Sequence, residues 1–121
     1  MITDKETNTI YFSEKLKTNF PKTYSHIVEV LYSVGIEPNF LPKTNDIWAR
    51  DFMPIQVSEN KFIQYRYAPD YLQIKKYRNT KSNLDIICQD IGLKTKKTDI
   101  ILDGGNVIKS SNHAILTDKV I

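Results

Sequence analysis

Apolar residues in the first third of this chain recur with the spacing of an amphipathic helix. Between Pro21 and Val34 they stand three or four residues apart, as on one helix face. The members of this stripe are Tyr24, Ile27, Val28, Leu31 and Val34. A proline suits a first helical turn, where its missing N–H costs little, and Gly35 is a natural stop. We therefore expect a helix from Pro21 to Val34.

A second helix is predicted over residues 82–91, with Gly92 as its end. Its apolar stripe consists of Leu84, Ile87, Cys88 and Ile91. Ser82 is followed three residues later by Asp85, which resembles a capping box with a shorter acid than usual. Because Cys88 lies on the apolar stripe, we expect a buried structural thiol there.

Short apolar runs predict strands at residues 10–12, 36–41, 62–67, 100–102, 107–108 and 114–116. Pro38 places its strand near an edge or an end. Alternation in the 62–67 run puts Tyr65 and Tyr67 on one face and Gln64 and Arg66 on the other. Residues 42–46, 58–61 and 103–106 have turn composition, and residues 94–99 form a polar connection.

The predicted order is β-α-β-turn-β-β-α-β-β-β, in which the segment 47–57 is the strand after the turn, and it indicates an α/β or α+β fold. With 121 residues the chain is one domain or part of one. The last two residues, Val120 and Ile121, form an apolar β-branched pair with nothing after them. We expect this open strand to be available for pairing with another chain.

Charge and composition exclude several classes of protein. The formal net charge is +3, and lysine supplies most of the positive charge, which favours solubility over nucleic-acid binding. One cysteine cannot form an internal disulfide, and with two histidines it is too little for a zinc cluster. The sequence has no apolar run near the roughly 18 residues that span a bilayer, and its polar start lacks a secretory signal. We expect a cytoplasmic protein that binds neither membrane nor nucleic acid.

Two segments contain several residues of types that often serve in binding or catalysis. The first, Trp48-Ala49-Arg50-Asp51-Phe52-Met53-Pro54, holds the single tryptophan. If this segment is a strand, Trp48 and Arg50 point one way and Asp51 the other. The second, Leu102-Asp103-Gly104-Gly105-Asn106, carries a carboxylate into a glycine pair that allows positive φ or close backbone approach.

Each segment also has a structural interpretation, since an adjacent Arg and Asp often form a salt bridge and D-G-G-N is often a plain turn. Together, however, Asp51 and Asp103 could present two carboxylates to one cation. A guanidinium is planar, permanently charged and offers a fork of N–H donors that carboxylates match. Two carboxylates would fix its plane and present its carbon to a nucleophile.

The two segments, about fifty residues apart, resemble the agmatine deiminase and bacterial-type peptidylarginine deiminase family. This family belongs to the guanidine-modifying superfamily with the pentein fold, a five-bladed ring of ββαβ-like modules. The resemblance runs from about Phe12 to Ile121. It implies a partial pentein-type β/α propeller of about two modules, with residues 1–121 as the N-terminal part of an incomplete domain.

The resemblance also implies residue roles. Asp51 matches the guanidinium-binding Asp of the family, and Asp103 matches the acid before Gly-Gly, which is usually Glu. Trp48 and Arg50 match residues that line or brace the substrate cleft. Asn106, with the two glycines before it, matches the turn that shapes the wall. We expect no cofactor and no metal.

The implied reaction is hydrolysis of a linear amidine, agmatine or peptidyl arginine, to a ureido product and ammonia, as in putrescine biosynthesis by agmatine deiminases. In the family, a Cys thiolate attacks the guanidinium carbon and a His in a G-H-x-D segment handles protons. His26, His113 and Cys88 do not match those segments. We therefore expect this chain to carry the substrate-gripping carboxylates and to be inactive alone.

Two alternatives stay open. A non-catalytic truncated pentein would bind guanidino compounds or pair with another chain through its open strand edge. A nucleic-acid platform would use basic and aromatic residues of one segment, and we do not favour it because that segment resembles a solvated connection into a helix. Its residues are Tyr71, Lys75, Lys76, Tyr77, Arg78 and Lys81.

Overall fold

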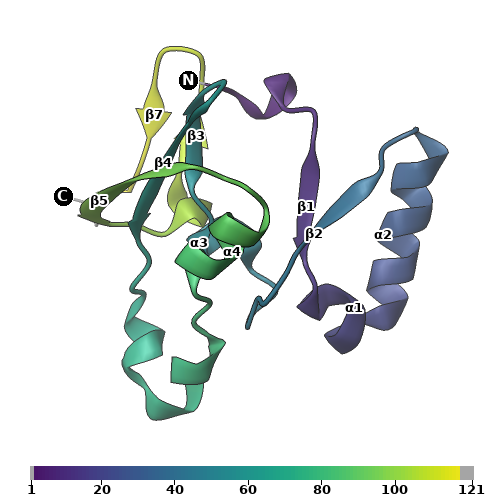
Figure 1. Ribbon diagram of the computed structural model, residues 1–121, viewed down its shortest axis with the longest axis horizontal. Coiled ribbons are helices and arrows are strands. Elements are labelled where there is room, and N and C mark those ends of the chain that lie inside the picture. The colour runs from purple at the N-terminus through teal and green to yellow at the C-terminus, as the bar shows by residue number, and fades with distance from the viewer. Residues whose placement is uncertain (1, 118–121) are drawn as a thin grey trace.

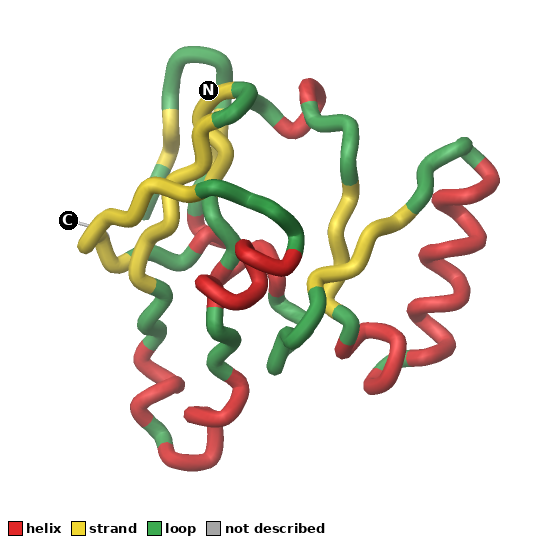
Figure 2. Tube along the Cα trace, viewed as in Figure 1, coloured by secondary structure: helices red, strands yellow, loops and turns green. Residues whose placement is uncertain are grey.

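The computed structural model describes residues 2–117 and shows a mixed α/β chain with three small sheets (Figures 1 and 2). The helices are α1 (Lys15–Asn19), α2 (Pro21–Ser33), α3 (Ala49–Phe52) and α4 (Leu84–Asp90). The strands are β1 (Ile10–Ser13), β2 (Pro38–Leu41), β3 (Ile55–Ser58), β4 (Lys61–Arg66), β5 (Thr95–Ile101), β6 (Ile108–Lys109) and β7 (Ala114–Ile115). Four 3-10 turns are η1 (Asp4–Glu6), η2 (Asp70–Gln73), η3 (Lys75–Thr80) and η4 (Gly104–Asn106). The predicted α+β class is confirmed, and the sheets of residues 2–117 form no closed barrel.

The first sheet pairs β1 with β2 in parallel, and α2 lies beside it (Figure 1). Tyr24 of α2 packs on Phe40 of β2 with ring centres 5.7 Å apart. The predicted helix is confirmed, since Pro21 opens it and Gly35 follows its end with φ +75°. Pro38 starts β2, as expected for a strand end. Helix α1 was not predicted, because five residues are too short for a clear period.

The second sheet has the order β3-β4-β5, antiparallel and then parallel. The prediction of a polar connection at residues 94–99 is wrong, because β5 already begins at Thr95. This residue pairs with Phe62 of β4, and backbone hydrogen bonds to β4 hold the polar run extended. An edge strand with lysines facing solvent is a common arrangement. The third sheet, β6 with β7, lies within a residue of its predicted bounds.

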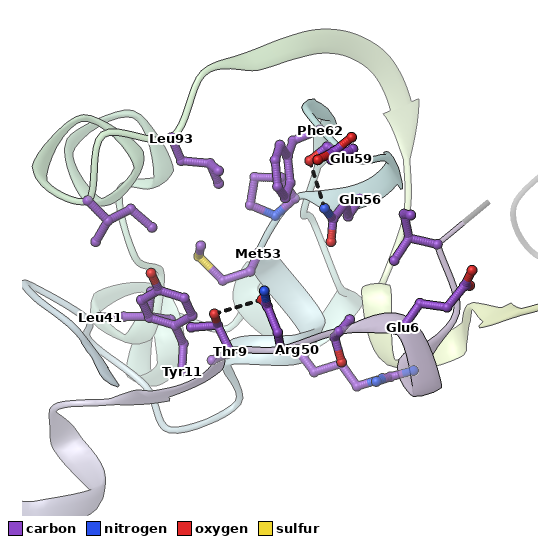
Figure 3. Close-up of a pocket in the computed structure, with 16 residues that line it drawn as sticks. Glu6, Thr9, Tyr11, Leu41, Arg50, Met53, Gln56, Glu59, Phe62 and Leu93 are labelled. Atoms are coloured by element: carbon purple, nitrogen blue, oxygen red, sulfur yellow. Dashed lines mark hydrogen bonds between the residues drawn. The ribbon is translucent and has the colours of Figure 1, made fainter. Parts of the chain in front are cut away.

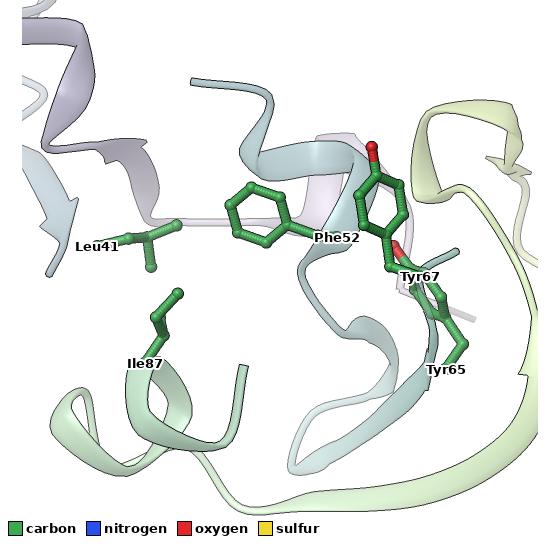
Figure 4. Close-up of a cluster of buried hydrophobic side chains, with 5 residues drawn as sticks. All are labelled: Leu41, Phe52, Tyr65, Tyr67 and Ile87. Carbon is green, nitrogen blue, oxygen red and sulfur yellow. The ribbon is translucent and has the colours of Figure 1, made fainter. Parts of the chain in front are cut away.

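The core lies where β4, α3, α4 and the end of β2 meet. Figure 4 shows Phe52 between Leu41 and Tyr67, with Ile87 reaching the cluster from α4. Tyr65 and Tyr67 are buried while Arg66 is exposed, so the predicted alternation of β4 is confirmed. Burying five such side chains contributes roughly 1.5–3 kcal/mol each, which fixes α3 against the sheet.

Helix α4 confirms the predicted apolar stripe, but its cap is Asn83 and not Ser82. The Asn83 side chain accepts the backbone N–H groups of Asp85 and Ile86, at 3.1 and 3.4 Å. The buried Ser82 hydroxyl accepts instead from the backbone N–H of Asn45, at 3.0 Å. A contact between distant segments thus removes Ser82 from the capping role that its sequence position suggests.

None of the helices within residues 2–117 combines the length and apolar character that crossing a bilayer would require. The predicted open strand at Val120 and Ile121 lies outside the described residues. Near the end of the described chain, β6 and β7 carry exposed aliphatic side chains, with Ile108 and Ile115 both more than half exposed.

Candidate functional site

The first motif forms a helical turn and not the strand considered above. Helix α3 spans Ala49–Phe52, and Pro54 ends it by forcing Met53 into an extended conformation. Phe52 is only 2% exposed and anchors the turn in the core. Helical geometry then separates neighbouring side chains, so that Trp48 and Asp51 line one hollow while Arg50 lines a different groove.

Asp51 and Asp103 lie together, although about fifty residues separate them. Asp103 stands at the start of η4, where its side chain accepts the backbone N–H of Gly105 at 2.9 Å. The two carboxyl groups lie close together, because a Cβ built on Gly105 would touch both of them. Burial and the nearby Asp103 and Asp46 raise the pKa of Asp51 to about 6, and Arg50 only partly offsets this. The pair therefore has an excess of negative charge that a bound cation would neutralise.

Both glycines of the second motif are required because a side chain at either position would not fit. A Cβ at Gly105 would collide with the Asp51 carboxylate and lie 3.1 Å from that of Asp103. A Cβ at Gly104 would overlap the backbone oxygen of Arg50 and the Tyr65 hydroxyl. Positive φ among the described glycines occurs at Gly35 and Gly92, so close approach is the reason for this pair.

Tyr65 connects α3 to the sheet, and the sequence alone did not reveal this role. Its ring is buried and its hydroxyl donates to the backbone oxygen of Asp51 at 2.6 Å. Burial, followed by the charge of Asp103, raises the pKa of Tyr65 well above its usual range. The hydroxyl thus stays protonated and holds the Asp51 backbone in place.

Arg50 braces the site from outside. Its guanidinium donates to the backbone oxygen of Val107, directly after η4, at 3.4 Å, and lies 3.7 Å from Asp4. Asn106 is exposed within η4, and its backbone N–H donates to the Asp103 carbonyl at 3.0 Å. Neither side chain lines the hollow beside Asp51.

An open hollow of about 580 Å³ lies in front of Asp51. It is lined by Asp46, Trp48, Asp51, Tyr71, Tyr77 and Thr80. The carboxylates of Asp46 and Asp51 and three aromatic rings make this surface suitable for a flat cation with an apolar stem. Asp103 does not line the hollow itself, although its carboxyl lies next to that of Asp51. Its volume is in the range of roughly 300–1,000 Å³ that small-molecule sites occupy.

A second groove of similar size, about 570 Å³, is lined by the Arg50 face of α3 and by the N-terminal arm (Figure 3). Its walls include Tyr11, Met53 and Phe62. Neither of the two predicted carboxylates lines it. The hollow beside Asp51 is therefore the better candidate for the predicted guanidinium chemistry.

Cys88, His26 and His113 do not line the hollow. Cys88 is 4% exposed within α4, and burial raises the pKa of its thiol. His26 is exposed on α2, and His113 is exposed just before β7. A thiol that is buried and kept protonated is a poor nucleophile.

Cys88 is expected to resist alkylation in the folded chain. Iodoacetamide should modify it at least about 100-fold more slowly than in the urea-unfolded chain, because the thiol is inaccessible and its pKa is raised. Mass spectrometry over time measures both rates. Rapid labelling of the native chain would contradict the structural role of this thiol.

Comparison with known proteins supplies an independent observation. Residues 1–121 match the family described as Porphyromonas-type peptidyl-arginine deiminase. Searches of curated proteins and of solved structures give no match. The matched range includes both motifs and every residue that lines the hollow.

Proposed function

Because this chain belongs to the Porphyromonas-type peptidyl-arginine deiminase family, we propose that the hollow beside α3 binds a guanidino group. Asp51 and Asp103 are the paired carboxylates that would hold it. The observation that carries the proposal is a close pair of carboxyl groups, of which that of Asp51 lines an aromatic-lined hollow. Each charge-assisted hydrogen bond from a guanidinium contributes about 1.5–3 kcal/mol, and the added charge relieves the repulsion between the two acids.

The proposed substrate is peptidyl arginine or agmatine, and the proposed reaction is hydrolysis to a ureido product and ammonia. A thiolate would add to the guanidinium carbon, ammonia would leave, and water would release the product and restore the thiol. We propose that the nucleophilic Cys and the basic His lie outside this segment. In support, Cys88 is buried and the two histidines lie away from the hollow.

We further propose that residues 1–121 are the N-terminal part of a larger pentein domain in a cytoplasmic protein. The isolated chain would then bind guanidino compounds without converting them. The alternative, a non-catalytic binding protein, predicts the same affinity and differs only in lacking any partner segment that restores turnover. Assays for ureido product, with and without added segments of the parent protein, separate these two possibilities.

Affinity for agmatine is expected to rise as the pH increases from 5 to 8. Below about pH 6 the Asp51 carboxyl is protonated and has lost its negative charge, whereas the guanidinium stays charged throughout. Affinity should therefore fall by up to about tenfold per pH unit below pH 6 and level off above it.

Trp48 provides the measurement, because it is the single tryptophan of the chain and lines the hollow. Its fluorescence can be titrated with agmatine at several pH values, and calorimetry can verify the affinities. Absence of binding at millimolar agmatine, or tighter binding at pH 5 than at pH 8, would refute the proposed function.

A further inference from the structure

We propose that Tyr71 and Trp48 form the walls that make this site select a planar guanidinium over an ammonium group. This inference rests on the proposed function and adds a specificity-determining residue, Tyr71. One wall of the hollow comes from residues 46–51, which supply two carboxylates and the ring of Trp48. The other wall comes from η2 and η3.

The second wall is an excursion of the chain that leaves β4 and returns to α4 (Figures 1 and 2). It brings Tyr71 and Tyr77 to the hollow, with the two rings edge to face and their centres 6.0 Å apart. Tyr71 remains 38% exposed and Trp48 62% exposed. Two aromatic surfaces therefore stay accessible beside the Asp51 carboxylate.

The position of Tyr71 is fixed from the core. Its hydroxyl is hydrogen-bonded to that of Tyr67 at 2.6 Å, and Tyr67 is only 7% exposed. The Tyr67 ring in turn packs on Phe52 of α3, with ring centres 6.2 Å apart. This connection ties the ring of Tyr71 to the same helix that carries Asp51, and so it positions the wall relative to the carboxylate.

These rings can distinguish two cations that the carboxylates attract equally. A guanidinium is flat and weakly hydrated, so it stacks on an aromatic face at little desolvation cost. An ammonium is compact and strongly hydrated, and it gains less from such a surface. Among the described residues that line the hollow, two are acidic and none is basic, so charge alone would not select between the two.

Tyr77 contributes to the wall in a different way. The Lys76 ammonium lies 5.4 Å from the centre of its ring, so this ring already has a cation beside it. Tyr71 has its hydroxyl bonded to Tyr67 and its ring edge to face with that of Tyr77, and it is therefore the residue to test.

The experiment compares agmatine with putrescine, which carries an amine where agmatine has its guanidinium. In Tyr71→Leu, affinity for agmatine is expected to fall about fivefold to twentyfold at pH 8, and affinity for putrescine by less than about twofold. Tyr71→Phe keeps the ring and should retain agmatine affinity within about threefold. Tyr32→Leu, at an exposed tyrosine on α2, is the matched control and should change neither affinity.

Thermal unfolding of each variant establishes that it is folded, and Tyr71→Phe keeps the test valid if Tyr71→Leu does not fold. The proposal that the ring selects the guanidinium would be overturned if Tyr71→Leu lost equal affinity for agmatine and putrescine. It would also be overturned if Tyr71→Phe lost as much agmatine affinity as is expected for Tyr71→Leu. Unchanged agmatine affinity in Tyr71→Leu would overturn it as well. In each of these cases the proposed function would still hold, provided that the chain binds agmatine and that this binding depends on Asp51. If the wild-type chain binds no agmatine, both the function and this inference fail.

Discussion

An Asp51→Asn variant is expected to bind agmatine at least about 100-fold more weakly than the wild-type chain at pH 8. The substitution keeps the shape of the side chain and removes one of the two negative charges that line the hollow. Losing one charge-assisted contact costs about 1.5–3 kcal/mol, and leaving a guanidinium beside a neutral amide donor adds to this cost. Fluorescence titration of Trp48 measures the change.

The same variant is expected to be more stable than the wild type without ligand. The folded chain raises the pKa of Asp51 to about 6, so between about pH 4 and 6 it holds a proton that the unfolded chain releases. Wild-type stability therefore falls as the pH rises through this window, and the loss persists above it. The neutral amide of the variant does not titrate, so Asp51→Asn should gain about 1 kcal/mol at pH 8 after allowance for partial exposure.

Asp90→Asn is the matched control, because Asp90 forms an exposed ion pair with Lys43 and does not line the hollow. It should leave agmatine affinity unchanged and alter stability by less than about 1 kcal/mol. If Asp51→Asn loses 100-fold in agmatine affinity and gains thermal stability, Asp51 contributes to binding and does not stabilise the fold. Equal affinity of Asp51→Asn and wild type would remove Asp51 from the site.

Alanine at Gly104 is expected mainly to lower stability, and alanine at Gly105 mainly to weaken agmatine binding. Gly104→Ala should destabilise the fold by about 3 kcal/mol or more, since its Cβ would overlap the Arg50 carbonyl and the Tyr65 hydroxyl. The backbone oxygen cannot move without displacing α3, and Gly104 is buried. In Gly105→Ala the Cβ would meet the end of the Asp51 side chain, which can rotate away. The expected cost is about 1 kcal/mol, with agmatine affinity at least about tenfold lower.

Urea unfolding and the Trp48 titration measure both effects for each variant. Gly92→Ala is the control, because its Cβ would meet nothing within 4 Å while its φ of +69° makes alanine unfavourable. It should cost about 1 kcal/mol through backbone strain and leave binding intact. If Gly104→Ala were as stable as the wild type, the close approach of η4 to α3 and β4 would be wrong.

The sequence alone predicted the features that depend on neighbours a few residues apart. The three-to-four residue period located α2 and α4 and placed Cys88 in the core. Two-residue alternation identified the buried face of β4. The motif pair around Asp51 and Asp103 led to the family, because the two segments in this order and at this distance resemble its members.

Contacts between distant segments decided the rest. The polar run from Thr95 became a strand because β4 provides its hydrogen-bond partners. Burial of Phe52 favoured a helical turn where a strand was considered, and that turn separates Arg50 from Asp51. Local pattern carries no information on such contacts, since each depends on groups that meet only after the chain has folded.

The same reason explains which parts of the site the sequence determined and which it did not. Residue types determined that two carboxylates were available, and tertiary structure decided that they lie close together, where burial and the charge of Asp103 raise the pKa of Asp51. The Tyr65 hydroxyl and the Tyr71 ring belong to the site only because the sheet and the η2–η3 excursion bring them to α3. The amino-acid sequence specifies which chemical groups a chain carries, whereas packing specifies which of those groups lie within a few ångströms of one another.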